Sequence, residues 1–179
     1  MPKLIKDRVV VDDAWTLLRD VASLDDVPAA TPVIVPLALW ERHRDALSAR
    51  GGVGVWLAPS DDPDTLACDV HRLPLIAVDF PQFTDGRGYS TARLLREKYR
   101  FMGELRAVGD VLRDQLYYLQ ACGFNAFAIR PDRDAAQALT GLSDFSDNYQ
   151  ATVTRPLPLF RRRGIGEGNA STQVEAGRR

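Results

Sequence analysis

The sequence predicts a single α/β domain built around a parallel sheet. From about residue 31, short apolar runs alternate with amphipathic stretches, a rhythm typical of consecutive strand–helix units. The run LPLIAVDF at residues 73–80 is almost continuously apolar, as in a strand covered on both faces. The 179 residues suffice for one domain with a proper core but not for two ordinary ones. We therefore predict an open, three-layer parallel sheet of five consecutive βα units, with a partial barrel as the alternative.

The five units can be placed along the chain from their apolar patterns. We expect strands at 31–36, 53–59, 73–80, 103–111 and 124–130, and helices at 39–52, 60–73, from about 90 to 99, 112–123 and 132–150. Gly51 and Gly123 stand where a left-handed residue ends a helix. A complete eight-fold barrel needs about 250 residues, so five units cannot close one.

Three segments of the chain differ in composition. Residues 1–30 are expected to form a small N-terminal hairpin or edge strand leading into a short helix, and residues 31–152 the α/β domain. Residues 153–179 are rich in glycine and polar side chains and are predicted to be a disordered basic tail. The last 19 residues, 161–179, hold five Arg and two Glu, a charge of +3, which leaves −4 on the rest of a chain whose net charge is −1.

These properties exclude several classes of function. A weakly acidic body does not favour nucleic-acid binding, although the basic tail could contact RNA or an acidic partner. No apolar run reaches the length of about 20 residues that crosses a membrane, and no secretory signal is recognised, so a cytoplasmic location is expected. Cys68 and His71 could share one helical face, but no second pair completes a metal site. Cys68 and Cys122 are expected to be reduced thiols, and no metal is predicted.

The connection after the third predicted strand is the first candidate site, because ligands of open α/β sheets bind beyond the carboxyl ends of the strands. It reads FTDGRGYSTAR, where Gly86 and Gly88 allow positive φ angles and a close approach to backbone amides. Ser90 or Thr91 could cap the helix that follows, and Arg87 or Arg93 could bind phosphate, sulfate or carboxylate. The candidate ligand-binding residues in this stretch are Thr84, Asp85, Gly86, Arg87, Gly88, Tyr89, Ser90, Thr91 and Arg93. An ordinary structural turn explains the same residues.

Two aspartates occupy equivalent places at the ends of predicted strands. Asp79 and Asp110 are candidates for a general acid and a general base. Asp110 could instead cap the next helix. Arg113 and Arg130 lie near the same rim and are further candidate ligand residues, with surface ion pairs as the alternative.

The connection lacks the fingerprints of nucleotide and redox cofactors. Thr91 stands where a third glycine would complete G-x-G-x-x-G, and no Gly-Lys-Ser/Thr sequence follows. No cofactor is therefore predicted. Tyr117 and Tyr118 are neighbours on a predicted helix and must point in different directions, so we expect one of them to be exposed for a partner.

The chain resembles a bacterial domain-of-unknown-function family, number nine-three-four. The resemblance rests on F-T-D-G-R-G-Y-S and G-D-V-L-R-D-Q, on residues 73–130 around them, and on the segments PKLIKDRVVVDDAW, PVIVPLALW and GVGVWLAP, so that it covers about residues 2–150. Members are often labelled uncharacterised or as oxidoreductases, and their genes typically lie beside those for sulfite or nitrite reductase and phosphoadenylylsulfate reductase.

What the resemblance implies is a role in assimilatory sulfate reduction, without catalytic residues to transfer. Two hypotheses follow. In the first, the protein is accessory to sulfite reductase and contacts that enzyme. In the second, it is a small enzyme or sensor that binds an anionic metabolite at residues 84–93. A homodimer is compatible with either hypothesis.

Overall fold

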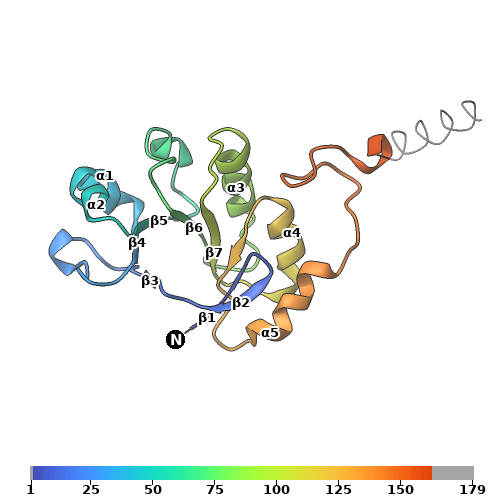
Figure 1. Ribbon diagram of the computed structural model, residues 1–179, viewed down its shortest axis with the longest axis horizontal. Coiled ribbons are helices and arrows are strands. Elements are labelled where there is room, and N and C mark those ends of the chain that lie inside the picture. The colour runs from blue at the N-terminus through green and yellow to red at the C-terminus, as the bar shows by residue number, and fades with distance from the viewer. Residues whose placement is uncertain (1, 163–179) are drawn as a thin grey trace, which may run out of the picture.

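A computed structural model describes residues 2–162, which form one mixed, eight-stranded sheet covered by short helices (Figure 1). The strands lie in the order β2-β1-β8-β7-β6-β5-β4-β3. Their bounds are β1 Lys3–Lys6, β2 Val9–Asp12, β3 Thr16–Leu17, β4 Val33–Pro36, β5 Val53–Leu57, β6 Leu75–Phe80, β7 Glu104–Gly109 and β8 Ala126–Phe127. Strands β3 to β8 are parallel, whereas β1 is antiparallel to both β8 and β2.

The helices follow the parallel strands. They are α1 Leu37–Arg42, α2 Arg44–Arg50, α3 Arg87–Glu97, α4 Leu116–Ala121 and α5 Ala135–Ala138, with 3₁₀ turns at Leu24–Asp26, Pro63–Leu66, Arg113–Gln115 and Leu139–Ser143. None of the helices within residues 2–162 has the length and apolar character needed to cross a membrane.

The strand order explains why the sheet curls instead of forming the predicted three-layer sandwich. Strands β3 to β8 lie side by side in chain order, so right-handed crossovers place every connecting helix on the same face. Figure 1 shows the helices along one side of a curved sheet, as in half of a barrel. The three-layer prediction is therefore wrong, and the partial barrel that was its alternative is closer to the structure.

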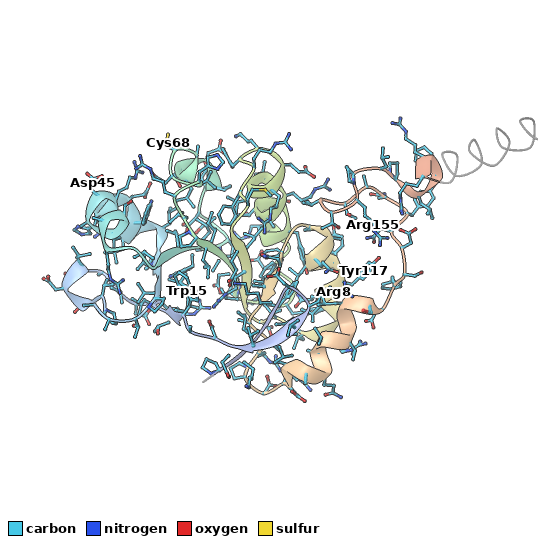
Figure 2. All side chains as sticks on the ribbon, in the orientation of Figure 1. Arg8, Trp15, Asp45, Cys68, Tyr117 and Arg155 are labelled. Carbon is cyan, nitrogen blue, oxygen red and sulfur yellow. The ribbon has the colours of Figure 1, made fainter. Side chains whose placement is uncertain are left out.

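The two faces of the sheet have different contents. On the helix-covered face, strand residues such as Val35, Val55 and Val78 join the main apolar core with residues of the helices. The opposite face has a smaller buried cluster of Ile34, Leu75, Ala77 and Val108, against which Trp15, Leu17 and Trp56 pack. The N-terminal segment that carries Trp15 runs along this second face (Figure 2).

Several predicted elements are shorter or different in the structure. The helix expected at 39–52 is divided into α1 and α2 at His43, whose φ of −127° is not helical. The segment 60–73 forms only a 3₁₀ turn, and the strand expected at 124–130 is reduced to β8. The short helix expected in residues 1–30 is reduced to the 3₁₀ turn Leu24–Asp26, and β3 pairs with β4.

The hairpin of residues 1–30 and two helix ends match the predictions. Strands β1 and β2 form an antiparallel hairpin. Gly51 and Gly123 follow α2 and α4 with φ angles of 69° and 111°, as expected of left-handed glycines at helix ends.

Part of the predicted tail is described. The Val153 amide donates to the carbonyl oxygen of Ala121, 3.1 Å away at the end of α4. Arg155 and Arg162 both pair with Asp147, at 2.9 and 2.6 Å. Residues 163–179, the rest of the predicted disordered tail, lie outside the described residues.

Candidate functional site

The connection from β6 to α3 lies at the carboxyl edge of the sheet, as predicted, but its helix begins earlier than expected. Helix α3 starts at Arg87, with Gly86 as its N-cap residue and no side-chain cap. Ser90 and Thr91 therefore lie inside the helix, and the Thr91 hydroxyl donates to the Arg87 carbonyl oxygen at 3.4 Å. The prediction that Ser90 or Thr91 caps the helix is wrong.

The carboxylate of Asp85 binds Arg87 at the start of α3. Its Oδ1 atom accepts hydrogen bonds from the Arg87 amide at 3.2 Å and from Arg87 Nε at 3.0 Å, and Oδ2 accepts from Nη2 at 2.7 Å. The Arg87 guanidinium holds the pKa of the Asp85 carboxyl below its usual value. An external anion at Arg87 would have to compete with this carboxylate.

The two glycines of the connection do not adopt the positive φ angles that were expected, and Gly88 is needed for close packing. Gly86 has a φ of −86°, and neither Gly86 nor Gly88 is among the residues with positive φ. A Cβ atom on Gly88 would lie 2.6 Å from Cζ of Phe80. Gly88 is therefore required for the close approach of α3 to β6, and the expected left-handed geometry is not present.

The other candidate arginines do not converge on the start of α3. Arg93 pairs with Glu97 one helical turn later, at 2.9 Å. Arg113 donates to Thr140 Oγ1 at 3.1 Å and pairs with Asp144 at 2.6 Å. Each guanidinium is thus directed toward a neighbour in the chain's own structure.

Asp110 holds the connection in place. Its Oδ2 accepts the Phe83 amide at 3.0 Å, and its Oδ1 accepts from Arg130 Nη1 at 3.1 Å. Gln115 Nε2 donates to the Phe83 carbonyl oxygen at 3.4 Å and so fixes the same residue from the other side. Arg130 also binds Asp132 at 2.6 Å, and these two carboxylates raise the pKa of Arg130. Asp110 therefore binds the backbone of the loop that follows β6 and does not cap the helical turn that follows β7.

Asp79 lies in a different ion pair, on the opposite face of the sheet. It is only 6% exposed, and its Oδ1 accepts from Arg19 Nη2 at 2.7 Å. The Arg19 guanidinium lies 5.6 Å from the centre of the Trp56 ring. Asp79 and Asp110 thus bind different arginines, and the structure gives no hydrogen bond between them that would mark a shared proton.

Sequence reasoning missed the cavity beside this pair. A space of about 520 Å³ at the ends of β4 and β5 is lined by Arg19, Arg42, Trp56 and Asp61, among others. Arg19 and Asp79 stand 60 residues apart in the sequence, so no local spacing marks them as partners. The only available signal was the position of Asp79 at a strand end.

An exposed group of aromatic side chains lies next to the β6–α3 connection. Phe83 is 43% and Tyr118 58% exposed. The Tyr118 ring lies 4.9 Å from that of Tyr89, centre to centre, and Gln115, just before α4, donates to the Phe83 carbonyl oxygen. We call Phe83, Tyr89 and Tyr118 the aromatic surface.

The predicted divergence of the two neighbouring tyrosines is confirmed. Tyr118 is exposed, whereas Tyr117 is half-buried and packs edge-on against Phe145 at 5.0 Å. The thiol of Cys122, one turn beyond Tyr118, is buried, and burial raises its pKa. Cys68 is also a free thiol, and residues 2–162 contain no group of three side chains suited to hold a metal ion.

The chain matches the model of a known protein family. The model of a family described as bacterial protein of unknown function, DUF934, matches residues 54–160, more than half of the chain. The comparisons with curated proteins and with solved structures gave no match. The matched region contains the β6–α3 connection and the whole aromatic surface.

Proposed function

The chain belongs to DUF934, a family of bacterial proteins of unknown function, and we propose that it is an accessory protein that docks on sulfite reductase through its aromatic surface. The partner comes from the resemblance described above. The docking mode is supported by one observation: Phe83 and Tyr118 are exposed, and hydrogen bonds with Asp110 and Gln115 hold the backbone of the loop that carries Phe83. Tyrosine and phenylalanine are enriched in the cores of protein interfaces.

The rigidity of the loop favours docking. Asp110 and Gln115 fix both backbone polar groups of Phe83, so presenting its ring to a partner requires little additional ordering. Tyr89 is partly buried between Phe80 and Tyr118, with rings 5.3 and 4.9 Å away. The aromatic surface is therefore already in place before a partner arrives.

Binding of an anionic metabolite at residues 84–93 is less favoured by the same geometry. The positions that an anion would use at Arg87 are filled by the Asp85 carboxylate. Arg93 is engaged by Glu97. The second hypothesis therefore requires both internal pairs to open.

The docking proposal is tested by measuring the affinity of the full chain for purified sulfite reductase. Tyr118→Ala is expected to weaken association by about tenfold or more, as for a central aromatic contact. Tyr149→Ala is the matched control, because Tyr149 is 70% exposed on a separate segment. Absence of association at micromolar concentrations, in both oxidising and reducing buffers, would count against the reductase as partner.

A thermal-shift series separates the metabolite hypothesis from docking. Sulfate, sulfite, phosphate and adenosine phosphosulfates are each added to the protein and to its Arg87→Ala variant. We expect no shift that depends on Arg87, because Asp85 occupies that guanidinium. A stabilisation that is lost in Arg87→Ala would support the metabolite hypothesis instead.

A further inference from the structure

The amino edge of the sheet, opposite to the edge that carries the aromatic surface, contains a basic trough. Two cavities of about 460 and 630 Å³ adjoin there and share Arg8, Gln120 and Thr154 as lining residues. The larger one lies beside the segments that enter β7 and β8, and the smaller one extends past α4 toward Arg155. Figure 2 shows Arg8, Tyr117 and Arg155 on the same side of the molecule.

Positive charge dominates the trough. Four arginines line it, namely Arg8, Arg96, Arg100 and Arg155, against one carboxylate, Asp7. Arg155 is paired with Asp147, but Asp147 is shared with Arg162. The trough therefore attracts anionic groups.

Arg96 adds a charge that its direct contacts do not neutralise. Its guanidinium donates to the carbonyl oxygens of Gly123 at 2.9 Å and Gly103 at 3.0 Å, and to Asn125 Oδ1 at 3.1 Å, which are all neutral acceptors. Burial lowers the pKa of Arg96, and the charge of Asp7 acts in the opposite direction. The arginine thus fixes the walls of the larger cavity and contributes to its positive potential.

Two tight turns of the backbone bring arginines into the trough. Within residues 2–162, the non-glycine residues with positive φ are Asp7, Arg8 and Arg100, at 47°, 67° and 55°, and all three line the larger cavity. Glycine or asparagine fits such positions better, so an arginine there costs free energy. Asp7 and Arg8 form the two-residue turn of the β1–β2 hairpin, and Arg100 follows the last turn of α3, where the Phe101 amide donates to the Leu95 carbonyl oxygen at 3.0 Å, so the positive φ angles belong to a hairpin turn and a helix end.

Arg8 and Arg100 differ in their contacts. Arg8 donates to Gln120 Oε1 at 3.3 Å and to Ser143 Oγ at 2.8 Å, so it helps to join the hairpin to the rest of the fold. Arg100 makes no side-chain hydrogen bond or ion pair with any residue that the structure describes. Its side chain is available to a ligand.

An apolar element completes the trough. Met102 is 89% exposed at its rim, the highest value among the large apolar side chains of the described chain. Below it the cavity is lined by Phe101, Phe124 and Phe127, each at most 2% exposed. A flexible thioether beside an arginine is well suited to contact an apolar side chain of a partner.

From these observations we propose that the trough binds an acidic peptide segment of a partner protein, with carboxylates at Arg8 and Arg100 and an apolar side chain against Met102. Two cavities that continue into each other across Arg8 suit an extended chain. Nucleic acid fits less well, because bases stack on exposed rings and the phenylalanines here are buried. This site lies on the edge opposite to the aromatic surface and does not depend on the docking proposed there.

The test uses the full chain and a short fluorescein-labelled peptide that alternates glutamate with leucine. Fluorescence anisotropy is expected to show salt-sensitive binding. Arg100→Glu should weaken it by about tenfold, whereas Arg72→Glu, an exposed arginine before β6, should change it less than about twofold. Peptides that alternate lysine with leucine, or glutamate with serine, should bind more weakly.

A second variant separates binding from folding. Arg100→Gly relieves the positive φ, so its melting temperature should be maintained or raised while peptide binding falls. The proposal is overturned if Arg100→Glu and Arg100→Gly both bind the peptide like the unmodified chain, or if no peptide binding occurs up to millimolar concentration. It is also overturned if a single-stranded oligouridine binds more tightly than the acidic peptide with the same dependence on Arg100.

Discussion

The helix-covered face of the sheet is packed with aliphatic and aromatic side chains, whereas the opposite face joins the sheet to the N-terminal segment through a smaller apolar cluster and buried ion pairs. On the first face, Phe80 lies 5.3 and 5.8 Å from the rings of Tyr89 and Phe124. On the second, Arg106 is 2% exposed and binds Glu104 at 2.7 Å and Asp13 at 2.8 Å.

The difference has a physical origin. Successive right-handed crossovers place the helices on one face of the sheet. Their apolar side chains are buried there, and this burial stabilises the fold without needing specific polar partners. The other face is covered by the N-terminal segment, which has little regular secondary structure. Ion pairs with buried side chains of the sheet fix the position of this segment. Removing one partner of such a pair leaves an unpaired buried charge, which makes this face sensitive to single substitutions.

Truncation of Phe80 is expected to have the largest effect on stability. Phe80→Ala should lower the free energy of unfolding by about 3–5 kcal/mol, because it removes a fully buried ring and leaves a cavity. Urea denaturation measures the change. The control is Phe83→Ala, where the ring is partly exposed and the expected loss is under about 1 kcal/mol.

Arg106 tests the charged face. Arg106→Met should cost about 3 kcal/mol, because Glu104 and Asp13 lose their shared partner. Combining it with Glu104→Gln and Asp13→Asn should recover part of the loss, since the carboxylates that faced the guanidinium are then neutral; Glu104 also pairs with Lys6 at 2.8 Å, which limits the gain. If the triple variant is no more stable than Arg106→Met, packing and not charge determines this face.

Gly88 tests how closely α3 approaches the apolar face. Gly88→Ala should lower the free energy of unfolding by about 1–3 kcal/mol, because the added methyl group overlaps the Phe80 ring. Gly86→Ala is the matched control, since its nearest neighbour would be Tyr89 at 4.0 Å. Equal effects of the two variants, measured by denaturation, would contradict the assigned role of Gly88.

The surface ion pairs of Asp147 with Arg155 and Arg162 should give the smallest effect, and this effect should depend on pH. Hydrogen bonding to Arg162 lowers the pKa of Asp147 from 3.8 to about 2. The pairing is therefore fully present above about pH 4 and is lost as the pH falls through about 2. Protection of the Val153 amide from hydrogen exchange should decrease over this range.

A control variant defines the source of that pH dependence. In Arg155→Gln/Arg162→Gln, Asp147 loses both guanidinium partners. The protection of Val153 should then be lower at neutral pH and should change little between pH values of about 4 and 2. An unchanged pH profile would assign the effect to another carboxyl group.

The sequence predicted the kinds of elements better than their arrangement. The apolar run at 73–80 identified β6, and the glycines after α2 and α4 marked their ends, because these signals are local. The sequence also placed the β6–α3 connection at a strand end. It did not reveal that Asp85 binds Arg87 or that Asp110 binds Phe83, since the same residues suit an anion site equally well.

What the sequence determined by itself is therefore an α/β chain with strand–helix alternation, left-handed glycines at two helix ends and an exposed tyrosine on α4. The tertiary structure alone decided that the strands lie in chain order, that the sheet curls, and that Asp79 meets Arg19. It also gathered Arg8, Arg96 and Arg100 into one trough. The reason is physical: periodicity and turn chemistry act within a few residues, whereas strand order and ion-pair partners depend on contacts between segments far apart in the chain.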